Sequence, residues 1–192
     1  SLLGATAAWG SDVYIDQAGS TSTIDITQTG DGNTVGSAGT ASTITGDNSD
    51  VDITQTGATN IADVSSSVGT SGTILDYTAT GSSNILEVEI DGAADTKLTA
   101  TITGDSNELT LCGTLGTDAA TATSATCATG VQADTTESTV AITGSSNKVA
   151  IAAGAANAIN NITIGANVAS GFNIVNLKQS GTDTPNVTLN MD

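Results

Sequence analysis

The side chains that could do chemistry in this sequence are almost all carboxylates. There are 20 Asp and Glu, three Lys and Arg together, and no His. Acyl transfer and most metal-assisted hydrolysis depend on His or on an activated nucleophile, and the sequence offers no such grouping. Paired carboxylates could serve a glycosidase, but such sites usually add aromatic platforms, and aromatic residues make up 2% of this chain. We therefore expect a protein that is not an enzyme and needs no cofactor.

The acidic residues are better explained as a solvated face. Several occupy alternate positions in segments with strand periodicity: Asp16, Asp25, Asp50, Asp52, Glu87, Glu89 and Asp91. They could bind divalent cations weakly, although neither EF-hand spacing nor a regular Gly-rich calcium repeat is present. A net charge of −17 repels nucleic acid and anionic membranes, so we expect neither as a partner and no insertion into a membrane.

The two cysteines, Cys112 and Cys127, lie in a segment rich in Ala and Thr that breaks the pattern of the rest of the chain. A disulfide between them would close a loop of about 15 residues and stabilise it by about 3 kcal/mol. An oxidised pair would indicate an extracellular, periplasmic or virion setting. The alternative is two small, buried, unpaired thiols.

A repeated motif positions these side chains. Apolar residues alternate, a Gly-x-x-Asn or Gly-x-x-Ser turn follows, and the alternation resumes, most plainly from Val51 through Gly57 and Asn60 to Val64. A period of two residues indicates β-strands, and Gly tolerates the positive φ that a tight turn requires. The turn recurs roughly every 11 or 12 residues, and no stretch has the apolar spacing of a helix.

This repeat predicts an all-β fold, a β-solenoid of stacked strand-turn-strand coils with about 22 to 24 residues per coil. We expect roughly seven coils, with Ile24, Ile26, Val51, Ile53, Leu86, Ile102, Leu109, Val140, Ile142 and Val149 facing inward. With 12% charged residues and few large side chains, the chain suits a stack of small coils better than a globular core.

The chain divides into an N-terminal segment, 1–12, and a repeat domain, 13–192, with an insertion near 112–138. Residues 1–10 resemble the end of a secretory signal peptide, since an apolar stretch precedes the small-residue sequence Ala5-Thr6-Ala7. That similarity favours a secreted protein. An end cap or an arm packed on a neighbouring molecule are two further roles for the segment.

The pattern Ile-x-Ile-x-Gln-x-Gly-x-x-Asn-x-Ala/Val-x-Val resembles the curlin repeat of bacterial curli fibre subunits. It matches at Ile24 to Val35 and at Val51 to Val64, and more weakly as far as Ile151. Similar repeats occur in virion proteins of marine bacteriophages. The resemblance implies a secreted β-solenoid in which buried amides form hydrogen-bonded ladders, at positions that here hold Gln17, Gln28, Gln55, Asn33, Asn60, Asn84, Asn107 and Asn147. The family's Gln is replaced by Ala79, Ile102 and Ile142.

Assembly is expected on physical grounds as well. The end coils of a solenoid expose unpaired backbone groups, and head-to-tail contact between copies gives an open filament. We expect a self-assembling subunit of an extracellular, curli-like fibre, or alternatively a bacteriophage virion fibre or decoration protein on the virion surface. The expected contact residues lie near the two termini: Ser1, Leu2, Leu3, Trp9, Val187 and Leu189.

Threonines suggest a third class of function, an ice-binding or adhesion β-solenoid. Thr-x-Thr precedes several turn glycines, and the period of two directs these side chains outward. Stacked coils would arrange them in a flat grid similar to that of solenoid ice-binding proteins. Thr is also simply a favourable residue on an exposed strand, so the motif alone does not decide between these explanations.

Overall fold

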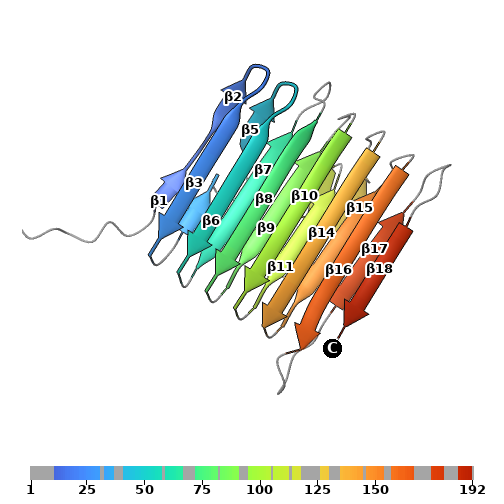
Figure 1. Ribbon diagram of the computed structural model, residues 1–192. Coiled ribbons are helices and arrows are strands. Elements are labelled where there is room, and N and C mark those ends of the chain that lie inside the picture. The colour runs from blue at the N-terminus through green and yellow to red at the C-terminus, as the bar shows by residue number, and fades with distance from the viewer. Residues whose placement is uncertain are drawn as a thin grey trace, which may run out of the picture.

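The structure of the protein is a computed structural model. It describes residues 11–30, 33–36, 41–57, 59–66, 72–81, 83–90, 95–104, 106–112, 114–117, 126–129, 135–144, 146–153, 157–166, 174–179 and 186–191. All elements in these residues are β-strands. Apart from one antiparallel hairpin, they form two parallel sheets that lie face to face, and the chain winds from one to the other (Figure 1). The predicted all-β solenoid is therefore confirmed.

One sheet, here called the front sheet, has seven strands and faces the viewer in Figure 1. In chain order its strands are β3 (Thr23–Thr29), β6 (Asp50–Thr56), β8 (Thr73–Thr80), β10 (Asp95–Thr103), β14 (Thr135–Gly144), β16 (Asn157–Ala166) and β18 (Asn186–Met191). Consecutive strands of this series pair in parallel. Each coil of the solenoid thus contributes one strand to this sheet.

The second sheet, the back sheet, has nine strands. Its main series is β1 (Ser11–Val13), β4 (Asn33–Val35), β7 (Asn60–Ser66), β9 (Ile85–Ile90), β11 (Glu108–Cys112), β15 (Lys148–Ala153) and β17 (Ile174–Gln179). In the first two coils the back strand is split, so β2 (Asp16–Ala18) pairs with β5 (Ser42–Thr45), and β5 pairs with the second half of β7. The two extra strands therefore belong to coils already counted in the front sheet.

The length of a coil can be read from equivalent asparagines. Asn33, Asn60, Asn84, Asn107 and Asn147 are separated in turn by 27, 24, 23 and 40 residues. The long interval contains an antiparallel hairpin made of β12 (Thr114–Thr117) and β13 (Thr126–Thr129). This hairpin falls within the segment 112–138 and contacts β11 and β15 of the back sheet. The coil is otherwise close to the predicted length.

The core lies between the sheets and consists of columns of equivalent side chains. All ten residues predicted to face inward are buried or packed against the buried cluster. One column contains Ile53, Tyr77 and Ala100 on successive strands. Tyr77 is larger than its neighbours in the column, and Ala79 on its own strand and Ala100 on the next are correspondingly small. Complementary volumes of this kind keep a core densely packed.

One residue departs from the predicted acidic surface. Glu87 was expected to be solvated, but it is 0% exposed. The strand register is nevertheless as predicted, because its neighbours Leu86 and Val88 belong to the core and Glu87 therefore lies on the outer face of the back sheet. That face is partly covered, since Asp63 in the adjacent strand is buried too and the hairpin β12–β13 lies against β9 and β11. Periodicity predicts the direction of a side chain but not what covers it.

The turn glycines form a column in which successive coils come very close. A Cβ built on Gly81 would overlap with the carbonyl oxygen of Gly57 in the preceding coil, and Gly57, Gly104 and Gly144 have the same relation to their own predecessors. Gly81 has φ of 150°, a conformation that other residues rarely adopt. At Gly30, in the first coil, a Cβ would meet nothing within 4 Å. The requirement for glycine therefore comes from stacking as well as from the turn.

This difference gives a matched pair of substitutions. Gly30→Ala introduces only backbone strain, on the order of 1–3 kcal/mol, because φ is 135° there. Gly81→Ala adds a steric overlap with the Gly57 carbonyl, so we expect a clearly larger loss of stability or failure to fold. Thermal unfolding followed by circular dichroism compares the two variants. Equal melting temperatures would contradict the close stacking at this corner.

Candidate functional site: the open ends and the amide ladders

The C-terminal end of the solenoid exposes a residue that occupies a core position. Leu189 in β18 is in register with Ile162 in β16, which is 1% exposed. Leu189 itself is 43% exposed, because no described strand lies beyond β18 in the front sheet. Within the described residues, the end of the stack thus exposes an apolar side chain beside the unpaired backbone edge of β18.

The N-terminal end is open in the same way within the described part of the chain. β3 pairs only with β6 in the front sheet, and β1 only with β4 in the back sheet. Val13, Ile15 and Ile24 point toward the core but are only partly buried, whereas Val51, the next residue in the column of Ile24, is fully buried. Figure 1 shows the two ends at opposite sides of the stack.

Of the predicted assembly residues, the structure places Leu189 on an open end. The backbone of Val187 belongs to the same strand, β18. Ser1, Leu2, Leu3 and Trp9 lie outside the described residues. Ile24 was predicted to face inward, but neither it nor Val13 or Ile15 was predicted to be a contact residue. These residues belong to the first copies of the repeat, and that position in the sequence could have identified them as contact residues.

The asparagines that follow the turn glycines form a hydrogen-bonded ladder through the core. Nδ2 of Asn60 donates to Oδ1 of Asn33 at 2.7 Å, and Asn84 donates to Asn60 in the same way. The ladder continues with Asn107 donating to Asn84 at 2.6 Å and Asn147 donating to Asn107 at 2.7 Å. All five side chains are buried. Pairing with the equivalent residue of the next coil is what allows an amide to be buried at this position.

A shorter ladder crosses the first three coils. Nε2 of Gln55 donates to Oε1 of Gln28 at 2.7 Å and to the carbonyl oxygen of Ile61 at 2.9 Å. The third coil has Ala79 at the equivalent position, and there the hydroxyl of Tyr77 donates to Oε1 of Gln55 at 2.8 Å. Burial raises the pKa of Tyr77 above its usual value, which keeps the hydroxyl protonated as a donor. The sequence pattern did not indicate this role of Tyr77, because Tyr77 stands at a core position and not at the position of the ladder amides.

Both ladders have a direction. In each bond between coils the residue later in the chain donates and the earlier residue accepts. Gln28 and Gln55 each also donate Nε2 to a backbone carbonyl of the back sheet, at Thr34 and Ile61, which fixes the orientation of the amide. Donors therefore point toward the N-terminal end of the stack.

Gln17 does not belong to the column of Gln28 and Gln55. It lies in β2 of the back sheet, in register with Ile44, and its Nε2 donates to the hydroxyl of Ser22 at 2.6 Å. The first two coils contain a second set of turns, Gly19 to Ser22 and Gly46 to Ser49, at the opposite margin of the sheets. Both sets of turns have the same local sequence pattern, a Gly followed three residues later by Asn or Ser. Spacing in the sequence therefore did not show that Gln17 precedes a turn of the second set.

Acidic side chains form a column on the outer face of the front sheet. Asp25, Asp52 and Asp76 are in register on β3, β6 and β8. The pKa of Asp52 lies above its ordinary value, first because of burial and then because of repulsion from Asp50, Asp76 and Asp25. Within the described residues, no group of three or more His, Cys, Asp or Glu is arranged to hold a metal ion.

The predicted cysteine pair falls at the junction between the back sheet and the hairpin. Cys112 ends β11, is buried, and is disulfide-bonded. The one other cysteine of the sequence is Cys127, in β13, and β13 contacts β11. A covalent bond from Cys112 holds the chain after β11 close to the outer face of the back sheet.

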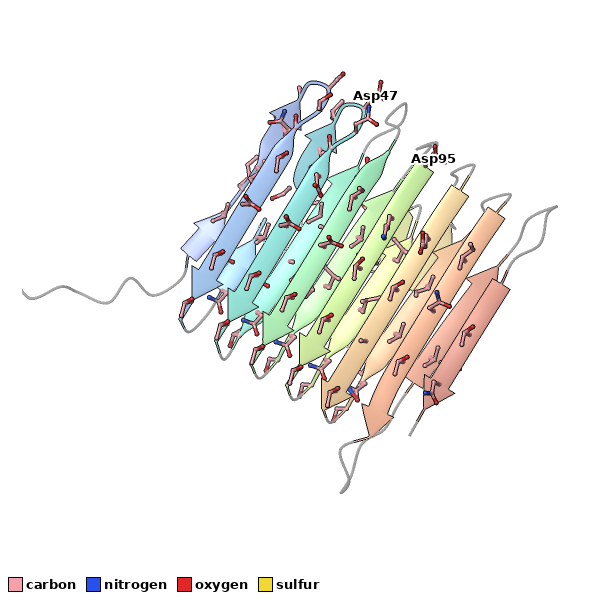
Figure 2. The ribbon with its side chains drawn as sticks, viewed as in Figure 1. Asp47 and Asp95 are labelled. Carbon is pink, nitrogen blue, oxygen red and sulfur yellow. The ribbon has the colours of Figure 1, made fainter. Side chains whose placement is uncertain are left out.

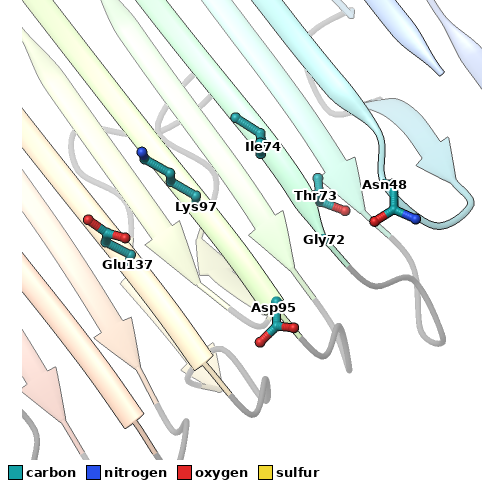
Figure 3. A pocket seen from close by; sticks show the side chains of 7 residues that line it. All are labelled: Asn48, Gly72, Thr73, Ile74, Asp95, Lys97 and Glu137. Atoms are coloured by element: carbon teal, nitrogen blue, oxygen red, sulfur yellow. The ribbon is translucent and has the colours of Figure 1, made fainter. Parts of the chain in front are cut away.

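A hollow of about 350 Å³ lies at the margin of the front sheet where β8, β10 and β14 begin (Figure 3). Lys97 and the carboxylates of Asp95 and Glu137 line it, together with Asn48, Gly72, Thr73 and Ile74. Asp95 and Asp47 mark the same margin in Figure 2. The hollow is open to solvent and its charges are of both signs, so it defines no specific ligand.

No protein-family model, curated protein or solved structure matches the chain. Among the described residues there is no helix that could cross a membrane.

The amide ladder gives a test of stability. Gln55→Ala removes the acceptor of the buried Tyr77 hydroxyl and the donor to Gln28, and one unpaired buried polar group costs about 1–3 kcal/mol. Thr54→Ala, at the exposed neighbouring position, should change the free energy of unfolding by no more than about 0.5 kcal/mol. Denaturant unfolding measures both variants. Indistinguishable midpoints would show that the ladder contributes nothing.

The acidic column gives a test of pH dependence. Because the folded-state pKa of Asp52 is raised above 3.8, its contribution favours the folded state below that value and is lost as the pH rises through the folded pKa. Asp52→Asn should therefore raise the melting temperature at pH 7 by more than Asp16→Asn, which removes an exposed carboxylate outside the column. The additional rise in melting temperature of Asp52→Asn over Asp16→Asn should disappear at about pH 3. An advantage that persists there would mean that charge repulsion is not its cause.

Proposed function

We propose that the protein is a structural subunit whose copies join through the ends of the solenoid to form an extracellular fibre. The observation that carries this proposal is the exposed Leu189 at a core position of the last coil. Stacking a further coil on β18 would bury this side chain and pair the free strand edge, as happens between coils within one molecule. The occupant that fits such an end is another coil of the same kind.

The end strands of the front sheet lack the usual protection against pairing, whereas β17, the last strand of the back sheet, contains Lys178. Natural proteins protect sheet edges with Lys, Pro, bulges or covering segments. The sequences of β3, TIDITQT, and β18, NVTLNM, contain neither Lys nor Pro, and no described segment covers either edge. A soluble monomer would be expected to block at least one of these edges.

The internal columns favour head-to-tail contact, in which the last coil of one copy stacks on the first coil of the next. Only this arrangement keeps the strands parallel and continues the columns, with Leu189 of one copy next to Ile26 of another. A two-fold contact would reverse the strands and place the Gly-x-x-Asn margin against the opposite margin. The direction of the amide ladders would also be reversed at such a contact.

The charge distribution supports the same arrangement. Residues 1–96 contain 13 acidic and no basic residues, whereas residues 97–192 contain seven acidic residues and three lysines. The strands follow chain order along the stack, so net charges of −13 and −4 lie toward opposite ends. Contact between two N-terminal ends is the most repulsive arrangement, and a head-to-tail filament avoids it. Added salt should promote assembly, because it screens the remaining repulsion.

A head-to-tail contact is heterologous, and one made by translation along the stack does not close into a ring. The same contact can therefore be repeated indefinitely, which is the requirement for a fibre. The disulfide at Cys112 supports an oxidising compartment, in agreement with an extracellular location.

The fibre proposal predicts a specific pair of phenotypes. Leu189→Asp places a charge in the axial contact and should abolish the long filaments seen by negative-stain electron microscopy. Thr188→Asp adds the same charge at the adjacent outward position of β18 and should leave them intact. Wild-type protein that stays monomeric at high concentration and moderate salt would overturn the proposal.

The direction of assembly can be tested by mixing two blocked variants. Leu189→Asp blocks the C-terminal end, and Ile24→Asp blocks the N-terminal end, with Thr23→Asp as its exposed neighbour control. Head-to-tail contact predicts that each variant alone is monomeric and that the mixture forms a one-to-one dimer by light scattering. Homodimers of each variant alone would instead show two-fold contacts. Val13→Asp is a second N-terminal variant in case Ile24→Asp loses its β-sheet spectrum.

A further inference from the structure

The outer face of the front sheet carries a two-dimensional grid of threonines. One column runs through Thr27, Thr54, Thr78, Thr101 and Thr163, with Ala141 between the last two. The second runs through Thr29, Thr56, Thr80, Thr103 and Thr143. All ten threonines are exposed. Figure 2 shows side chains projecting from this face in regular rows.

The geometry of parallel strands sets the spacing of the grid. Neighbouring strands lie about 4.8 Å apart, and residues two apart on one strand are separated by about 6.6 Å. Figure 1 shows the front strands running almost parallel, with little of the fanning that twists most open sheets. The outer face is therefore close to a plane with a regular repeat in both directions.

The threonine side chains are fixed in position, and their hydroxyls are available for binding. Branching at Cβ restricts χ1, and the strand beneath is held by core residues such as Tyr77 and Ile102 and by the Gln55 ladder. Within the described residues, no hydrogen bond engages the hydroxyl of a grid threonine. Each position therefore presents one methyl and one free hydroxyl with little conformational entropy to lose on binding.

The back sheet is an internal control for strand propensity. It has the same coils, yet its outward columns are mixed, for example Ile61, Ile85, Glu108 and Lys148 in one column and Asp63, Glu87, Thr110 and Ala150 in the next. In that sheet Lys148 pairs with Glu108 at 3.6 Å. If threonine were used only because it favours strands, both outer faces should show it. The enrichment is confined to the flat, uncovered face.

We propose that this face binds ice. A ligand that uses ten equivalent groups must itself be periodic in two dimensions, and both repeats of the grid lie close to oxygen spacings on prism planes of hexagonal ice. Each hydroxyl-to-water bond is weak, but a rigid grid adds many of them without further ordering. The grid contains no charge, and the acidic column of Asp25, Asp52 and Asp76 borders it on one side. This activity does not rest on fibre assembly, since a single copy carries the whole grid.

The test compares the same change, Thr to Lys, at two positions. Thr78→Lys places a long charged side chain in the centre of the grid, and Thr59→Lys places it at an exposed turn position outside the grid. We expect the wild type to show thermal hysteresis and to be retained in a growing ice hemisphere. Thr78→Lys should lose most of both activities, and Thr59→Lys should keep them. Thr78→Val, which keeps the shape and removes the hydroxyl, should lose part of the hysteresis.

Circular dichroism establishes that the variants are folded, and Thr101→Lys replaces Thr78→Lys if that variant is not. A wild-type protein with neither hysteresis nor retention in ice would overturn the proposal. Equal loss in Thr59→Lys and Thr78→Lys would overturn it as well, because the effect would then come from charge and not from the grid.

Discussion

The close approach of successive coils at the Gly-x-x-Asn corner is the constraint on which the rest of the structure depends. There the glycine of one coil lies so near the preceding carbonyl that a Cβ would overlap with it. The asparagine three residues later donates its amide to the asparagine of the previous coil. Because both contacts are made between equivalent residues, they keep the coils in register. The parallel pairing of both sheets and the columns of the core follow from that register.

The same contacts give the solenoid a direction and two different ends. Every ladder bond is donated toward the N-terminal end, and negative charge is concentrated in the first half of the chain. Each coil is stabilised mainly by its neighbours, so the first and last coils that the structure describes each lack one described partner. The fibre proposal is the extension of this coil-to-coil contact from one molecule to the next.

The two outer faces of the solenoid have different environments although the coils that form them are the same. The front face is open and carries the threonine grid, whereas Glu87, Thr110 and other polar residues of the back face are buried. The hairpin after β11 lies against β9, β11 and β15, and Cys112 is covalently bonded at its base. Among the described residues, the insertion thus covers part of the back face and none of the front face, which stays open for interactions along the side of the stack.

The sequence by itself determined the fold class, the length of the coil, the inward-facing residues and most of the amide ladder, because each follows from a local period and a turn motif. Only the tertiary structure decided that Gln17 belongs to the back sheet, that Glu87 is buried, that Tyr77 completes the glutamine ladder and that Leu189 is exposed at a core position. These facts depend on which strands lie side by side and on what covers them. Such contacts join residues more than 20 positions apart in the chain, and no local pattern encodes them.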